Sequence, residues 1–191
     1  LEPFTATLSL VVLAPVSVEV NGPANLHVGE SGQFQARGVF ADGSSTDFSS
    51  RASWTSSNPA TATVASSGSK KGLVSCRKSG AVEISAAWGD LRSSASLAIE
   101  APVRLQVTPP TAGGKGCGSA QFAATATFAD GSSTDVTRIA SWSSSNPSIA
   151  TVDSNGLARC VSGDGGTVTI TARLEGRQAT ASMTWTPFPD G

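Results

Sequence analysis

Cysteines are the residues of this chain with the most distinctive chemistry. There are three of them, Cys76, Cys117 and Cys160, in a sequence of 191 residues. A pair of cysteines can close a disulfide, whereas a single thiol either stays buried as a small apolar group or bonds to another molecule. Which of these applies depends on where the fold places the three sulfur atoms.

Carboxylates are the second candidate for chemistry. The hexapeptide Asp-Gly-Ser-Ser-Thr-Asp brings Asp42 close to Asp47, and its copy brings Asp130 close to Asp135. Calcium takes six to eight oxygen ligands, and the fixed spacing of a calcium loop is missing here. Asp before Gly is typical of a turn, so we interpret Asp42 and Asp130 as turn residues, with a calcium site as the alternative.

Catalysis has little support. His27 is the one histidine, and no nucleophile motif surrounds it. The glycine-rich segment 113–118 lacks the Gly-Lys-Ser/Thr spacing of a phosphate loop, so we read it as a flexible loop. We therefore expect no enzyme activity, no metal and no cofactor.

The elements that position these residues come in two copies. Phe40–Asp47 returns unchanged as Phe128–Asp135, and the segment 53–59 returns with one change as 141–147. A period of this length exceeds a solenoid unit and fits a small β-sandwich. The repeat predicts one such sandwich as domain 1 at residues 15–100 and a second as domain 2 at residues 101–191. The linker is nearly absent, which predicts a stiff, end-to-end pair.

Hydrophobic residues alternate with polar ones throughout both copies. Val16, Val18 and Val20 alternate with Ser17 and Glu19, and turn signals such as Asp-Gly and Asn-Pro separate such segments. Alternation of period two indicates antiparallel strands with one buried face, and no segment has a helical period. We predict an all-β fold of two tandem sandwiches with an extra N-terminal strand.

The repeat also distinguishes the cysteines. Cys76 and Cys160 occupy equivalent positions, whereas the counterpart of Cys117 in the first copy is Gly29. We predict a Cys117–Cys160 disulfide, with two free thiols as the alternative, and an oxidising compartment. Cys76 is then predicted to be a buried free thiol, with an intermolecular bond as the alternative.

Tryptophans are expected mainly in the core. Trp54 and Trp142 are repeat equivalents, and we predict that both are buried at matching positions. Trp88 and Trp185 have no tryptophan counterpart in the other copy, which makes them better candidates for a surface contact, although packing is still favoured over ligand binding for both.

The string Ala-Asp-Gly-Ser, Trp-Ser-Ser-Asn-Pro, Ala-Thr-Val, Asn-Gly-Leu and Ile-Thr-Ala strongly resembles bacterial immunoglobulin-like domains of group 2. The resemblance is clearest from Gln121 to Ala172 and covers nearly all of residues 15–186. It implies a sandwich fold and a non-enzymatic role, as in intimin- and invasin-like adhesins, other surface proteins, accessory modules of secreted enzymes and phage structural proteins. The first copy departs from the pattern at residues 66–71.

Residues 1–14 precede the first domain and nevertheless alternate like a strand. They resemble the closing strand of a domain, since Leu10 aligns with Leu97 and Val12 with Ile99. This segment is either left over from a longer array or donated to a neighbour, and strand donation of this head-to-tail kind propagates as a fibre. The predicted subunit junction consists of Phe4, Ala6, Leu8, Leu10 and Val12.

Charge and hydrophobicity exclude two classes of partner, nucleic acid and the membrane interior. The net charge is −1 and only 14% of residues are charged, so a nucleic-acid partner is not expected. The apolar stretch 8–20 is interrupted by Pro15 and Glu19, so no membrane insertion is expected. We expect a secreted or cell-surface structural protein of bacteria, a filament or stalk subunit whose partners are copies of itself or a host or surface ligand. The alternatives are a spacer in a larger adhesin or phage protein, and a carbohydrate-binding accessory domain of a secreted enzyme.

Overall fold

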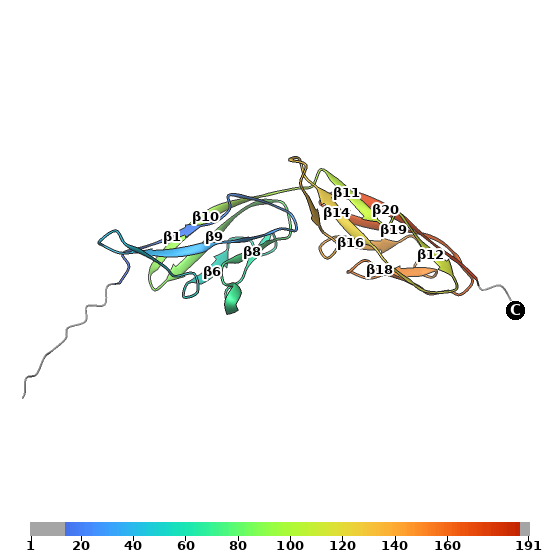
Figure 1. Ribbon diagram of the computed structural model, residues 1–191, viewed down its shortest axis with the longest axis horizontal. Coiled ribbons are helices and arrows are strands. Elements are labelled where there is room, and N and C mark those ends of the chain that lie inside the picture. The colour runs from blue at the N-terminus through green and yellow to red at the C-terminus, as the bar shows by residue number, and fades with distance from the viewer. Residues whose placement is uncertain (1–13, 188–191) are drawn as a thin grey trace, which may run out of the picture.

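The computed structural model describes residues 14–187 and contains two β-sandwiches that follow one another along the long axis of the molecule (Figure 1). Every sheet takes its strands from one half of the chain only. The prediction of an all-β fold with two tandem immunoglobulin-like sandwiches is confirmed. The extra N-terminal strand and its residues Phe4, Ala6, Leu8, Leu10 and Val12 lie outside the described residues.

The first sandwich contains ten strands and one short 3-10 helix. In chain order they are β1 (Ser17–Asn21), β2 (Asn25–His27), β3 (Ser31–Gln33), β4 (Gln35–Val39), β5 (Ser45–Asp47), β6 (Ser53–Ser56), β7 (Ala62–Val64), η1 (Gly68–Lys70), β8 (Leu73–Cys76), β9 (Gly80–Trp88) and β10 (Leu91–Glu100). The 3-10 helix lies in the segment 66–71, where the two copies differ in sequence.

The second sandwich repeats the same strands without the helix. They are β11 (Arg104–Thr108), β12 (Thr111–Lys115), β13 (Ser119–Gln121), β14 (Ala123–Thr127), β15 (Ser133–Asp135), β16 (Ser141–Ser144), β17 (Ala150–Val152), β18 (Leu157–Cys160), β19 (Gly166–Leu174) and β20 (Arg177–Thr186). Only residues 101–103 separate β10 from β11. The exact domain limits, 15–100 and 101–191, stay a prediction from the repeat.

Each sandwich has one four-stranded sheet, in the order β2-β10-β9-β6 and β12-β20-β19-β16. The facing layer consists of two three-stranded sheets, β1-β4-β5 with β3-β8-β7 and β11-β14-β15 with β13-β18-β17. All strand pairs are antiparallel except β2 with β10 and β12 with β20, which are parallel. Glu100 therefore lies opposite His27, and Thr186 lies opposite Lys115. These matched registers make His27 and Lys115 structural equivalents.

The core of each sandwich is built from the inward residues of the alternating strands. Phe34 and Phe122 are fully buried equivalents, as are Ile84 and Ile170. Burial of such side chains contributes about 1.5–3 kcal/mol each to folding. The alternation seen in the sequence thus produces the two apolar layers directly.

The four tryptophans differ from their predicted roles in one respect. Trp54 is buried, with 3% of its surface exposed, but its equivalent Trp142 is only partly buried against the core. Their indole N–H groups nevertheless donate equivalent hydrogen bonds, to the carbonyl oxygens of Ser49 and Thr137. Trp185 takes the packing role favoured for it and not the surface contact, because its ring is buried and packs beneath Gly118.

Candidate functional site: the interdomain junction and the two poles

The junction between the sandwiches centres on His27, at the end of β2. Its imidazole stacks on the ring of Phe128 in the second sandwich, with 4.1 Å between the ring centroids. Its Nε2 lies 3.5 Å from a carboxylate oxygen of Asp130 and 3.9 Å from one of Glu100. The one histidine of the chain is therefore a contact residue between the two sandwiches.

Glu30 provides the second contact of this junction. Its carboxylate accepts a hydrogen bond from the backbone N–H of His27 at 2.9 Å and one from the Thr134 hydroxyl of the second sandwich at 3.4 Å. The Nδ1 atom of His27 lies 3.1 Å from the same carboxylate. Burial alone would raise the pKa of Glu30, but the His27 backbone and imidazole and the Thr134 hydroxyl outweigh it and lower this pKa.

Two further contacts widen the junction. Gly29 has a φ of +94°, and a side chain there would lie 3.0 Å from Val136 of the second sandwich. A glycine thus lets the two backbones approach closely. The Ser79 hydroxyl donates a hydrogen bond to the Glu175 carboxylate at 2.9 Å. Together these residues join the sandwiches at several separated points.

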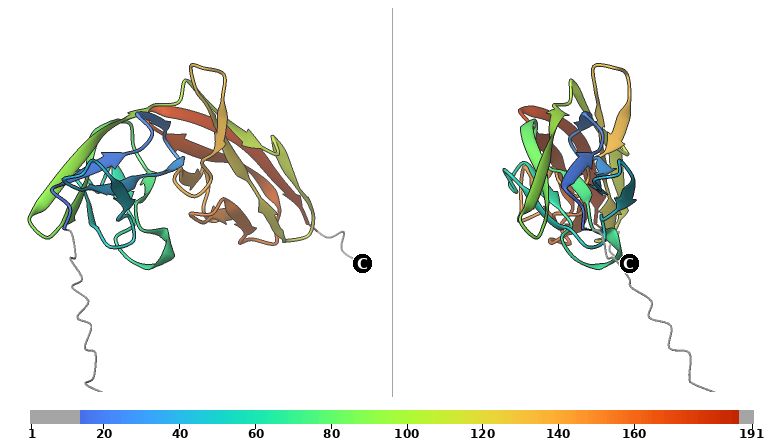
Figure 2. Two further views of the ribbon diagram at one scale, coloured as in Figure 1. Left: turned by 60° about the vertical axis from the view of Figure 1, so that its left-hand side comes forward. Right: turned by 90° about the vertical axis from the view of Figure 1, so that its left-hand side faces the viewer.

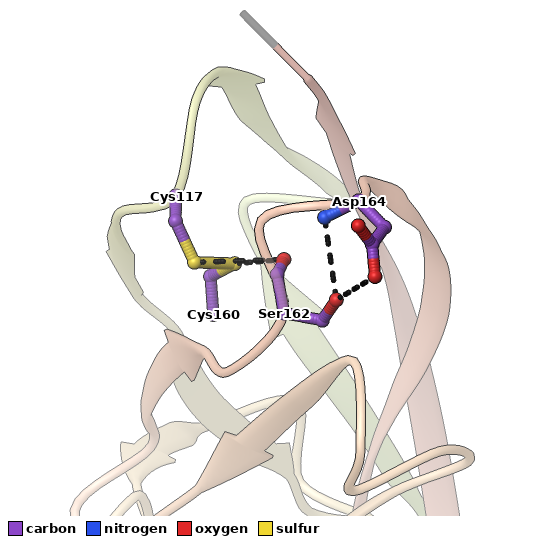
Figure 3. The surroundings of a disulfide bond; sticks show 4 residues. All are labelled: Cys117, Cys160, Ser162 and Asp164. Carbon is purple, nitrogen blue, oxygen red and sulfur yellow. Dashed lines mark hydrogen bonds between the residues drawn. A yellow bond between two sulfur atoms is a disulfide. The ribbon is translucent and has the colours of Figure 1, made fainter.

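The far end of the second sandwich, which we call the C-terminal pole, is formed by Lys115, Cys117, Gly118, Cys160 and Val161. Cys117 and Cys160 form a disulfide there (Figure 3), as predicted. Each cysteine lies near the carbonyl oxygen of Ser162, and the Ser162 hydroxyl donates to Asp164. The prediction of a flexible loop at 113–118 is wrong for residues 113–115, which belong to β12 and pair with β20, and the bond fixes the end of this segment to β18.

Cys76 occupies the equivalent place in the first sandwich without a partner. Its thiol is buried and free, as predicted. Burial first, and the nearby Glu30 carboxylate second, raise the pKa of this thiol to about 11. Because the thiolate is the reactive form, Cys76 is chemically quiet in the folded protein.

The opposite end of the molecule, which we call the N-terminal pole, is formed by Phe40, Asp42, Phe48, Arg51 and Trp88. The Phe48 ring lies between those of Phe40 and Trp88, at centroid distances of 6.4 and 5.0 Å, and the Arg51 guanidinium lies over it. Trp88 is partly buried in this cluster, which places it in packing at the edge of the core.

The paired aspartates hold turns at both copies of the repeat. Asp42 accepts hydrogen bonds from the backbone N–H and the hydroxyl of Ser44, which lower the pKa of its carboxyl. Asp130 accepts a hydrogen bond from the backbone N–H of Ser132 in the equivalent turn. Their interpretation as turn residues is supported, and Asp130 has a second role because it faces His27.

The sequence did not identify the junction. From the sequence, His27 is a candidate only for catalysis. Glu30, Ser79 and Glu175 belong to no sequence motif. One signal is present in the sequence: His27 stands where the second copy has Lys115, so the chemistry of this position differs between two otherwise similar copies.

Within residues 14–187 no cluster of histidine, cysteine and acidic side chains has the arrangement of a metal site. The same part of the chain contains no helix of the length and hydrophobicity that spanning a membrane requires.

Comparison with known proteins finds similarity to bacterial immunoglobulin-like proteins. Residues 14–99 match the bacterial Ig-like domain (group 2) family, and residues 139–173 match the intimin immunoglobulin-like domain family. The group 2 match falls on the first sandwich, whereas the resemblance was expected to be clearest in the second.

A curated relative and solved structures extend this similarity. Ice-binding protein 1 of Shewanella frigidimarina is 33% identical over 95% of this chain, which spans only 19% of that protein. The S-layer protein rSbsC(31-844) is 15% identical with a TM-score of 0.39, over 94% of this chain and 29% of that one. A chimeric titin Z1Z2 is 11% identical with a TM-score of 0.37, over 95% of this chain and all of that one.

Proposed function

Because this chain belongs, through residues 14–99, to the bacterial Ig-like domain (group 2) family, we propose that it is a non-enzymatic structural protein that acts as a stiff rod. The rod would serve as a stalk or filament segment in the secreted space or at the cell surface of bacteria. The observation that carries this proposal is the junction, where His27, Gly29, Glu30 and Ser79 hold the second sandwich at separate points.

The chemistry of the chain supports an oxidising location. The Cys117–Cys160 disulfide is compatible with secretion, since such bonds persist outside the reducing cytosol. The similarity to a much longer ice-binding protein favours a spacer segment within a larger protein. Binding of a surface, ice or a sugar would then belong to other segments of such a protein.

The rod is tested by measuring the distance between its two ends. Spin labels at exposed Ser44 and Ser119, attached through cysteines in a Cys76→Ala background, should give one narrow distance distribution. The matched variant Gly29→Val places a branched side chain against Val136 and should broaden that distribution while both sandwiches stay folded. A broad distribution in the unaltered junction would contradict the proposal.

Donation of the N-terminal strand is a second, finer candidate. It is motivated by the alternating residues Phe4, Ala6, Leu8, Leu10 and Val12, which are those of a closing strand. Deleting residues 1–14 should leave two folded sandwiches and abolish assembly. Assembly by the truncated chain would contradict strand donation without affecting the rod.

A further inference from the structure

The two poles of the molecule are built from positions equivalent to the two sides of the internal junction. The first comparison concerns the end of each sandwich at which its last strand finishes. In the first sandwich the Val28 N–H donates to the Glu100 carbonyl, and in the second the Gly116 N–H donates to the Thr186 carbonyl in the same way. The Cys76 N–H bonds to Glu30, and the Cys160 N–H bonds to Gly118. Lys115, Cys117 and Gly118 therefore stand at the C-terminal pole where His27, Gly29 and Glu30 stand at the junction. The Cys117 disulfide, and not a bare glycine, would meet the next copy, so the end contact is a wider version of the junction.

The opposite ends of the two sandwiches are equivalent too: the end of the second sandwich that contacts the first corresponds to the N-terminal pole. The Phe128 N–H donates to the Ser132 carbonyl, and the Phe40 N–H donates to the Ser44 carbonyl. The Val136 N–H bonds to Ala124, as the Phe48 N–H bonds to Ala36. Phe40, Asp42 and Phe48 thus stand at the N-terminal pole where Phe128, Asp130 and Val136 receive the first sandwich.

The two poles are complementary in charge and in apolar surface. At the junction the His27 ring covers Phe128 and faces Asp130. In a repeated contact, the Lys115 ammonium would face the Phe40 ring and the Asp42 carboxylate, which gives a cation–π contact and an ion pair. Asp42 and Lys115 are both exposed. Val161 adds apolar surface at the C-terminal pole, with 57% of its surface exposed.

The phenylalanine at the N-terminal pole is more exposed than its equivalent at the junction, as expected if no neighbouring side chain covers it. Phe128, which carries the His27 ring, is 1% exposed, whereas its equivalent Phe40 is only partly buried. The two poles lie at opposite ends of the long axis (Figure 1), and the two sandwiches between them form an arch (Figure 2). A contact between them is therefore possible between molecules but not within one.

We propose that copies of this chain dock end to end, with the C-terminal pole of one copy seated on the N-terminal pole of the next. The partner is a second copy of the same chain, selected by Lys115 facing Asp42 and by the partly exposed ring of Phe40. The contact is head-to-tail, so it does not close on itself and adds subunits in a line. This inference rests on the proposed rod function, because only a rigid junction gives a regular succession of such contacts.

The test uses sedimentation velocity of the full chain from micromolar to millimolar concentration. Lys115→Gln and Asp42→Asn each remove one charge of the proposed ion pair. Asp42→Asn keeps a side-chain oxygen that can accept the hydrogen bonds from Ser44. Each variant should raise the dissociation constant for self-association roughly two- to five-fold. The double variant should have the same dissociation constant as the single ones, because both changes remove the same ion pair. A zero-length carbodiimide cross-link should join the Lys115 peptide to the Asp42 peptide.

Matched controls separate this contact from other causes. Lys70→Gln removes an exposed lysine from the 3-10 helix, which belongs to neither pole, so this variant should associate like the unaltered chain. The chain without residues 1–14 separates this contact from strand donation, because here it should still associate and still respond to Asp42→Asn, whereas strand donation predicts that it stays monomeric. A chain that stays monomeric throughout, controls that weaken association equally, or cross-links that avoid both residues would overturn the proposal. The spin-label distances would still report on the rod independently.

Discussion

Removing the disulfide gives the sharpest test of how the second sandwich is stabilised. Cys117 and Cys160 are 43 residues apart in the sequence. Closing a loop of that length removes conformational entropy from the unfolded chain equivalent to about 4 kcal/mol. A domain of this size has a total free energy of unfolding of roughly 5–13 kcal/mol. The bond therefore supplies a large fraction of the stability of this half of the molecule.

The measurement compares the oxidised chain with Cys117→Ala/Cys160→Ala in urea, by hydrogen exchange resolved to individual peptides. A loss of about 4 kcal/mol should lower the midpoint of the second sandwich by roughly 2–3 M urea. Peptides of the first sandwich, which has no disulfide, are the internal control and should keep their midpoint. A change of less than about 1 kcal/mol, or two freely alkylated thiols in the native protein, would refute the reasoning.

Three further outcomes follow from other parts of the structure. Trp54→Ala should lower the free energy of unfolding by about 3–5 kcal/mol. Trp142→Ala should lower it less, because Trp142 is more exposed while the indole N–H bonds are equivalent. Equal losses in urea denaturation would contradict this. Iodoacetamide at pH 8 should label Cys76 only after unfolding, since burial raises the pKa of its thiol to about 11, and rapid native labelling in a mass spectrum would count against its burial. Because the pKa of Glu30 is lowered in the folded protein, its stabilisation of the junction is complete above its ordinary value of 4.5 and is lost as the pH falls through the lowered value. The spin-label distance distribution should broaden on acidification, and Glu30→Gln should remove that component of the pH dependence.

The sequence was sufficient for the strands but not for the contacts between repeats. Period-two alternation identified the strands because one face of each sheet packs in the core, as Ile84 and Ile170 do. The Ser79–Glu175 bond spans 96 residues and involves no repeated motif, so no local pattern could predict it. Interdomain geometry depends on how two finished surfaces meet, and this information is not contained in either strand pattern.

Burial of the tryptophans illustrates the same limit within a domain. Trp185 takes the core position of Ile99, and Gly118 leaves the room for its larger ring, since a side chain there would lie 2.9 Å from the indole. The glycine was visible in the sequence, but its relation to Trp185 required the fold. Trp54 and Trp142 share their local sequence, yet Lys71 donates to the Ala52 carbonyl beside Trp54 from a loop that the second copy replaces with a shorter turn.

The parallel pairing of β2 with β10 and of β12 with β20 determines how the molecule responds to tension. A pull on the two ends of a sandwich draws these paired strands along their own length in opposite directions, so their hydrogen bonds are loaded together in shear and do not open one after another. The register contains three residue pairs in the first sandwich and five in the second. The first sandwich should therefore yield at the lower force. When the second yields, Cys117–Cys160 keeps 43 residues looped, which shortens its extension by roughly 150 Å.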